Sequence, residues 1–131
     1  MHTGKGQVTE LILLDGIRHA RISCAADLIP LPGQYLLAGG ASDAPLPVPL
    51  FHTDSTPGGL IAAPAPDSWM PGMELYVRGP LGKGFALPAS ARKIALVAFD
   101  DPPTRLRALI PFALKQGASL VVVADNHVED L

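Results

Sequence analysis

Hydrophobic positions follow two different patterns along the chain. From residue 7 to about residue 88, short apolar stretches are separated by Gly and Pro. Within Met73–Arg78 the apolar side chains occupy every second position, which is the spacing of a strand with one buried face. This pattern predicts antiparallel β structure in the first part of the chain, with Leu75 and Val77 turned inward.

Turn signals divide this first part into six short strands. Asp15-Gly16 is a strong hairpin signal, because both residue types tolerate the positive φ angles of a tight turn. Six short strands at this spacing are typical of a small barrel or sandwich, and Leu36 is expected to face its core. The expected strands are Gln7–Leu14, Ile17–Cys24, Gln34–Ala38, Leu50–Thr53, Leu60–Ala63 and Met73–Arg78.

The second part of the chain follows a β-α-β pattern. Lys93–Phe99 and Ser119–Ala124 are continuous apolar runs, as expected for parallel strands covered on both faces. Between them, apolar residues at helical spacing predict a helix over Thr104–Gln116 with Asp101 as its cap. Pro111 is expected to kink this helix, because proline lacks a backbone donor.

Composition narrows the class of protein. The 131 residues include 13 Gly and 14 Pro, too many helix breakers for a helical bundle, and 48% are apolar, too many for a disordered chain. A net charge of −2 gives no basic field for nucleic acid, and no apolar run approaches the roughly 20 residues of a membrane span. Without an apolar signal segment at its start, the chain is expected to be cytoplasmic.

Three Gly- and Pro-containing motifs occur in order along the chain. They are Pro32-Gly33-Gln34, Pro71-Gly72-Met73-Glu74 and Gly79-Pro80-Leu81-Gly82-Lys83-Gly84-Phe85. This set resembles the ferredoxin reductase-like family, and most closely the electron-transfer subunit of dihydroorotate dehydrogenase. The expected fold is mainly β with an α/β extension. A six-stranded antiparallel Greek-key barrel over residues 7–88 would precede a truncated β-α-β remnant of a nucleotide-binding domain over residues 92–131.

The resemblance implies FAD on the barrel, yet the matching flavin motif is altered. The family motif is Arg-Pro-(Leu/Phe/Tyr)-Ser, and the corresponding segment here is Val48-Pro49-Leu50-Phe51. Pro49 and Leu50 match and are the only candidate cofactor-binding residues carried over. Val48 replaces the arginine that would pair with the flavin diphosphate, and guanidinium–phosphate pairing is the strong part of such a site. Phe51 replaces the hydroxyl residue, although a shifted register would put Thr53 in that role.

The expected nicotinamide site is altered as well. The family has a glycine-rich turn after the first strand of its nucleotide domain, where backbone N–H groups face the pyrophosphate. The turn here is Phe99-Asp100-Asp101-Pro102, whose two carboxylates would repel that anion.

Other polar groupings have ordinary explanations. His52 and Asp54 are spaced to share a strand face, but two ligands are too few for a metal site, so a polar surface edge is expected. Asp125, His127 and Glu129 are interpreted as a solvated tail. Cys24, the only cysteine, is expected to be a packed thiol, and one cysteine excludes a disulfide within the chain.

Two functions remain after these observations. The main hypothesis is a non-catalytic structural or interaction protein that kept a ferredoxin reductase-like scaffold and lost both ligands, with no cofactor and no metal. The alternative is an FAD-dependent electron-transfer subunit of an oxidoreductase with an atypical or partner-completed flavin site. A single helix can cover only one face of the second sheet, so we also expect a homodimer through the β-α-β unit, or a protein partner.

Overall fold

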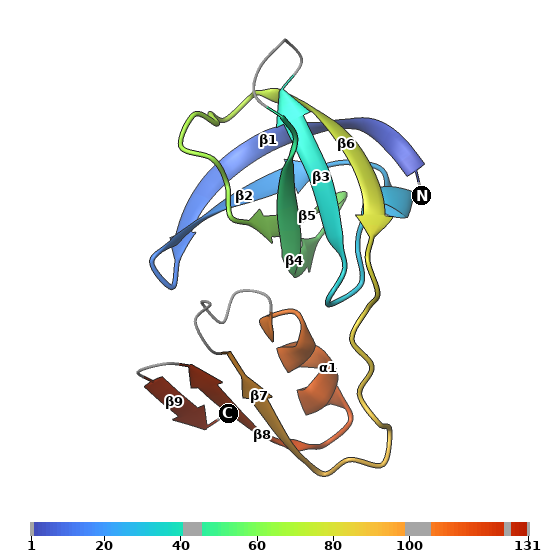
Figure 1. Ribbon diagram of the computed structural model, residues 1–131, viewed down its shortest axis with the longest axis vertical. Coiled ribbons are helices and arrows are strands. Elements are labelled where there is room, and N and C mark those ends of the chain that lie inside the picture. The colour runs from blue at the N-terminus through green and yellow to red at the C-terminus, as the bar shows by residue number, and fades with distance from the viewer. Residues whose placement is uncertain (1, 41–45, 99–105, 125–126, 131) are drawn as a thin grey trace.

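The computed structural model describes residues 2–40, 46–98, 106–124 and 127–130. It contains a barrel and a smaller α/β unit, joined by an extended segment that follows the last barrel strand (Figure 1). The expected turn at Phe99–Pro102, the cap at Asp101 and the tail residue Asp125 lie outside the described residues. Within the described ranges, no helix has the length and apolar character needed to span a bilayer.

The barrel is closed and antiparallel throughout. Its strand order is β1-β2-β5-β4-β3-β6, the Greek-key arrangement that was expected, and a short 3-10 helix, η1, follows β2. The Asp15-Gly16 hairpin is confirmed, with φ angles of 54° and 72° at the two residues. The bounds are β1 (His2–Leu14), β2 (Ile17–Ser23), η1 (Ala26–Leu28), β3 (Tyr35–Gly40), β4 (Val48–Thr56), β5 (Gly59–Ala63) and β6 (Glu74–Leu81).

Strand β1 begins at His2, earlier than the expected start at Gln7. Residues 2–7 contain two glycines and no apolar alternation, so the sequence gives little sign of a strand there. These residues form a strand because they pair with β6, from His2 opposite Gly79 to Gln7 opposite Glu74. This pairing closes the barrel.

The barrel interior is an apolar core. Leu36 and Leu75 have no exposed surface and Val77 is 3% exposed, so the predicted inward positions are confirmed. Each buried aliphatic side chain of this size contributes about 1.5–3 kcal/mol to folding. The other core residues include Val8, Ala20, Ile22, Leu28, Ala38, Leu50, Leu60, Ala62 and Trp69.

The smaller unit is a three-stranded sheet with one short helix. Strands β7 (Lys93–Val97) and β8 (Ser119–Ala124) are parallel, and β9 (His127–Asp130) pairs antiparallel with β8. His127 and Glu129, which the sequence suggests lie in a tail, therefore belong to a strand that is paired with β8.

Helix α1 (Leu109–Lys115) begins later than the expected start at Thr104. Pro111 is the third residue of α1, within the first turn, where backbone N–H groups have no partner inside the helix. It therefore removes no helical hydrogen bond, and the expected kink is wrong.

Candidate functional site

A small cavity lies at the junction of the barrel and the α/β unit. Its volume is about 200 Å³, and side chains from β1, β4, β5 and the start of α1 line it. Two lining residues, Thr53 and Asp54, come from adjacent positions of β4. The other lining residues are Leu14, Ile61, Arg107, Ile110 and Pro111. We call this cavity the junction pocket.

A β-bulge in β4 brings Thr53 to the junction pocket. His52 pairs with Ala62 and Asp54 pairs with Ile61, so Thr53 is the extra residue of the bulged strand. Its side chain is 6% exposed, and Oγ1 donates a hydrogen bond to the carbonyl oxygen of Ile61 over 2.9 Å. Bulges redirect side chains and occur preferentially beside active sites.

The same bulge separates His52 from Asp54. His52 is buried and Asp54 is exposed, so the two side chains do not share the strand face that was expected. His52 Nε2 lies 2.9 Å from Ser55 Oγ, and Nδ1 has no partner in the described part of the chain. Burial lowers the pKa of His52, and the Asp54 carboxylate opposes this with a smaller effect. In the described residues, no three metal-ligating side chains gather into a group.

An ion pair crosses the junction beside the pocket. Arg107 Nε donates to Asp15 Oδ2 over 2.6 Å, and Arg107 Nη2 donates to Asp15 Oδ1 over 2.9 Å. Asp15 belongs to the β1–β2 hairpin turn and Arg107 precedes α1, so the pair joins the two units. Sequence reasoning missed this pair, because the two residues are 92 positions apart.

The residues carried over from the flavin motif do not line the junction pocket. Leu50 is fully buried in the barrel core, while Pro49 is exposed on the outer side of β4. Val48 is half-buried and packs against the core. Phe51 lies against Tyr35, with ring centroids 5.8 Å apart. A ligand on the outer surface of β4 would therefore contact Pro49 directly, and Leu50 would only support the strand beneath it.

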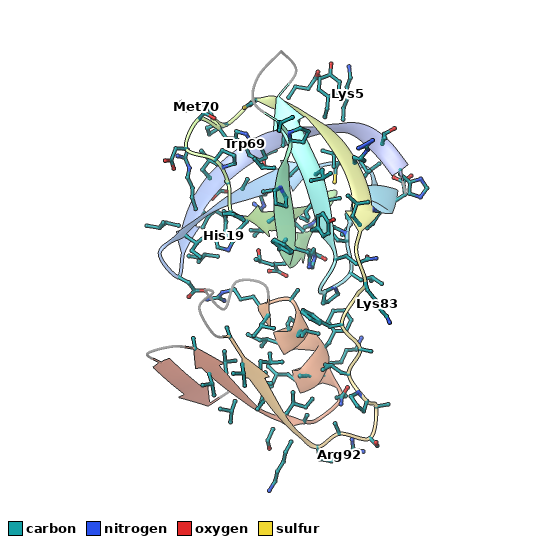
Figure 2. All side chains as sticks on the ribbon, viewed as in Figure 1. Lys5, His19, Trp69, Met70, Lys83 and Arg92 are labelled. Atoms are coloured by element: carbon teal, nitrogen blue, oxygen red, sulfur yellow. The ribbon has the colours of Figure 1, made fainter. Side chains whose placement is uncertain are left out.

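The segment after β5 is held to the barrel by Arg18. Its guanidinium donates to the carbonyl oxygens of Asp67 and Trp69 over 3.0 and 2.8 Å, and Ala65 N donates to the carbonyl oxygen of Arg18. Trp69, from this segment, is 3% exposed and belongs to the barrel core (Figure 2). This segment therefore packs against the barrel.

Cys24 lies just after β2 and is half-buried. Burial raises the pKa of its thiol, and the nearby Asp27 carboxylate raises it further. Both effects favour the unreactive thiol, in agreement with the expected packing role.

Comparisons with known proteins identify the fold. No protein-family model matches the sequence, and no curated protein sequence matches it. Among solved structures, the ferredoxin reductase in carbazole 1,9a-dioxygenase superposes with a TM-score of 0.75 at 14% identity, over 94% of this chain and 42% of that one. The cytochrome b5 reductase domain of Ulva prolifera nitrate reductase gives a TM-score of 0.68 at 14% identity, over 94% and 62%.

A third structure extends the comparison. The flavohem-like FAD/NAD binding domain of nitric oxide dioxygenase from Vibrio cholerae O1 biovar El Tor gives a TM-score of 0.68 at 15% identity, over 92% of this chain and 62% of that one. The chain thus has the same barrel fold as these structures, a ferredoxin reductase-like fold, and it spans less than two thirds of the length of each of them. The narrower resemblance to the dihydroorotate dehydrogenase subunit stays a prediction.

Proposed function

We propose that this chain is a flavin-dependent electron-transfer component whose flavin ring occupies the junction pocket. The observation that carries the proposal is the bulge in β4, which puts Thr53 into a cavity between the two units. The sequence resemblance assigns a hydroxyl residue on this strand to the flavin ring. One similar structure is named as an FAD/NAD binding domain, and another as an FAD apo form.

The junction pocket fits the ring end of the cofactor. About 200 Å³ is below the roughly 300 Å³ at which cavities for whole ligands begin, so the rest of a dinucleotide would lie outside it. Leu14, Ile61 and Ile110 provide apolar walls that exclude water from a flat ring. A bound flavin would supply the ability to take up electrons in pairs and release them one at a time.

Two polar side chains would orient the ring. Thr53 Oγ1 already donates its proton to the carbonyl oxygen of Ile61, so this oxygen would accept a hydrogen bond from a ring N–H. Arg107 also lines the pocket, and its positive charge would favour electron density on the ring. Asp15 holds the guanidinium of Arg107 in place through two hydrogen bonds.

A scaffold without a cofactor is the second candidate function. The observation that favours it is Val48, which stands at the position of the family arginine and packs against the barrel core. A valine cannot neutralise a diphosphate, so this flavin site would lack its strongest phosphate contact.

Titration of the protein with FAD tests the proposal against this candidate. We expect a concentration-dependent rise in melting temperature, corresponding to about 2.7 kcal/mol at 100 times the dissociation constant. Thr53→Val should weaken FAD binding. Thr9→Val is the matched control, because the Thr9 hydroxyl also donates to a backbone carbonyl oxygen but lies on an exposed part of β1. If FAD leaves the melting temperature unchanged, the scaffold function is favoured.

A further inference from the structure

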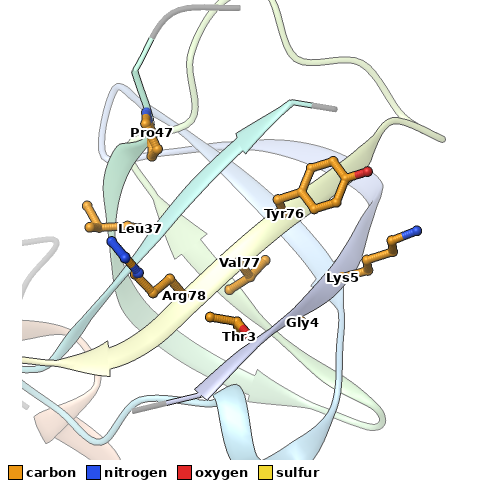
Figure 3. A pocket seen from close by; sticks show the side chains of 8 residues that line it. All are labelled: Thr3, Gly4, Lys5, Leu37, Pro47, Tyr76, Val77 and Arg78. Atoms are coloured by element: carbon orange, nitrogen blue, oxygen red, sulfur yellow. The ribbon is translucent and has the colours of Figure 1, made fainter. Parts of the chain in front are cut away.

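A second and larger cavity lies on the outer face of the barrel. Its volume is about 410 Å³, and side chains of β1, β3 and β6 line it together with Pro47 (Figure 3). We call it the outer-face hollow. It shares no lining residue with the junction pocket. Its main side chains are those of Thr3, Lys5, Leu37, Pro47, Tyr76 and Arg78.

Strand register explains why these side chains meet. Arg78 on β6 pairs with Thr3 on one side and with Leu37 on the other, and Tyr76 pairs with Lys5 and Gly39 in the same way. Residues 76 and 78 therefore point outward together, about 7 Å apart along the strand. Gly39 contributes no side chain, and a Cβ built there would lie 3.5 Å from Pro47 Cα. Pro47 therefore packs close to Gly39 and forms one wall of the hollow.

The hollow combines an apolar surface with a cation that pairs with no carboxylate in the described part of the chain. Leu37, Pro47 and the ring of Tyr76, which is 46% exposed, supply the apolar surface. Arg78 is exposed and makes no ion pair or side-chain hydrogen bond with any described residue. Its guanidinium lies beside Leu37 in Figure 3. A guanidinium with no ion pair among the described residues can bind an anionic ligand.

The opposite end of the hollow carries a weaker cation. Lys5 Nζ lies 5.6 Å from the centre of the Tyr76 ring and 3.7 Å from Glu74 Oε1. Glu74 partly neutralises this ammonium, so the end near Arg78 is the better anion site. In Figure 3, Lys5 and Arg78 lie on opposite sides of Tyr76 and Val77.

We propose that the outer-face hollow binds a phosphorylated nucleoside. The base would lie on the apolar surface of Leu37, Pro47 and Tyr76, because a planar aromatic ring buries well against such side chains. The phosphate would accept hydrogen bonds from the Arg78 guanidinium, whose planar fork matches phosphate oxygens. The ligand is either a free mononucleotide or the adenylate end of a dinucleotide, which share this chemistry. The inference does not depend on flavin in the junction pocket.

Calorimetric titration with AMP tests this proposal. Adenosine and inorganic phosphate are titrated separately, and we expect each to bind at least tenfold more weakly than AMP. Arg78→Gln should weaken AMP binding about tenfold, the loss typical of one charge-assisted contact. Arg21→Gln is the matched control, because Arg21 is also an exposed strand arginine but pairs with Glu10 away from the hollow. It should leave AMP binding unchanged.

Amide NMR spectra during the AMP titration locate the site. Shifts at residues 3, 37, 76 and 78 support the proposal, while shifts confined to other residues overturn it. AMP that binds no better than adenosine, or equally well to Arg78→Gln and the unaltered chain, also overturns it. Parallel titration with NAD separates the two sources: tighter binding than AMP, lost in Arg78→Gln, identifies the adenylate end of a dinucleotide, and weaker binding identifies a free mononucleotide.

Discussion

Arg107 donates two hydrogen bonds to the carboxylate of Asp15 across the junction between the barrel and the α/β unit. Asp15 is a turn residue with a φ of 54°, so its carboxylate is presented from the β1–β2 hairpin. The two side chains are 38% and 29% exposed, which leaves the pair partly shielded from water. A bidentate, partly buried pair of this kind can position one structural unit on another.

Breaking this ion pair should loosen the junction. We expect Asp15→Asn to lower the free energy of unfolding by about 1 kcal/mol, because asparagine keeps the positive φ of the turn but loses the charge. Urea denaturation measures the change, and faster proteolysis within residues 82–92 reports the loosened junction. In a double-mutant cycle with Arg107→Gln, fully additive effects of the two substitutions would contradict a direct pairing.

His52 should make stability depend on pH. Burial lowers the pKa of folded His52 below its ordinary value of about 6.5, so the unfolded chain binds this proton more readily. Stability is therefore fully present above about pH 6.5 and falls as pH decreases from there toward the folded pKa. Urea denaturation at pH 7.5 and pH 5 should show this loss, and His52→Gln should reduce it. An unchanged pH dependence in His52→Gln would show that other groups cause it.

Much of the barrel is predictable from the sequence. The Met73–Arg78 alternation and the Asp15-Gly16 turn are local signals, and the structure confirms both. The β4 bulge is different, because it depends on how β4 and β5 match in register. In a regular strand, alternating side chains would put His52 and Asp54 on the same face. The bulge breaks this alternation and buries Thr53 beside the junction pocket. The sequence therefore predicts Thr53 as the hydroxyl residue of the flavin motif only if the register is shifted from Phe51.

The α/β unit is less predictable from the sequence, because several of its features depend on contacts between residues that are far apart in the chain. Strand β9 is four residues long and contains one apolar residue, so only its pairing with β8 makes it a strand. Helix α1 starts late, at Leu109, and this start puts Pro111 in the first helical turn. A proline is tolerated there because the backbone N–H groups of that turn have no partner inside the helix. Arg107 had no local pattern to mark it, since its partner comes from the other unit.

We also predict a homodimer through the sheet of the α/β unit. Helix α1 covers the face that carries Leu96, Leu120 and Val122, as expected for a single helix. The other face of β7 is open, and Val97 there is 46% exposed. Covering this apolar face with a second chain would remove it from water.

Light scattering over a dilution series tests the dimer. Val97→Asp should shift the protein toward a monomer of 13.7 kDa. Leu13→Asp is the control, because Leu13 is 73% exposed on the barrel and should leave assembly unchanged. Val122→Asp is unsuitable as an interface probe, since Val122 is buried beneath α1. An unaltered protein that stays monomeric at high concentration would contradict the prediction.

Flavin retention is the most direct test of the proposed electron-transfer function. The purified protein is incubated with excess FAD, passed through a gel-filtration column, and its visible absorbance is compared with its protein concentration. The flavin proposal predicts close to one bound flavin per chain, with reduced retention in Thr53→Val and normal retention in Thr9→Val. A colourless protein after gel filtration, with all three proteins alike, would contradict a flavin in the junction pocket.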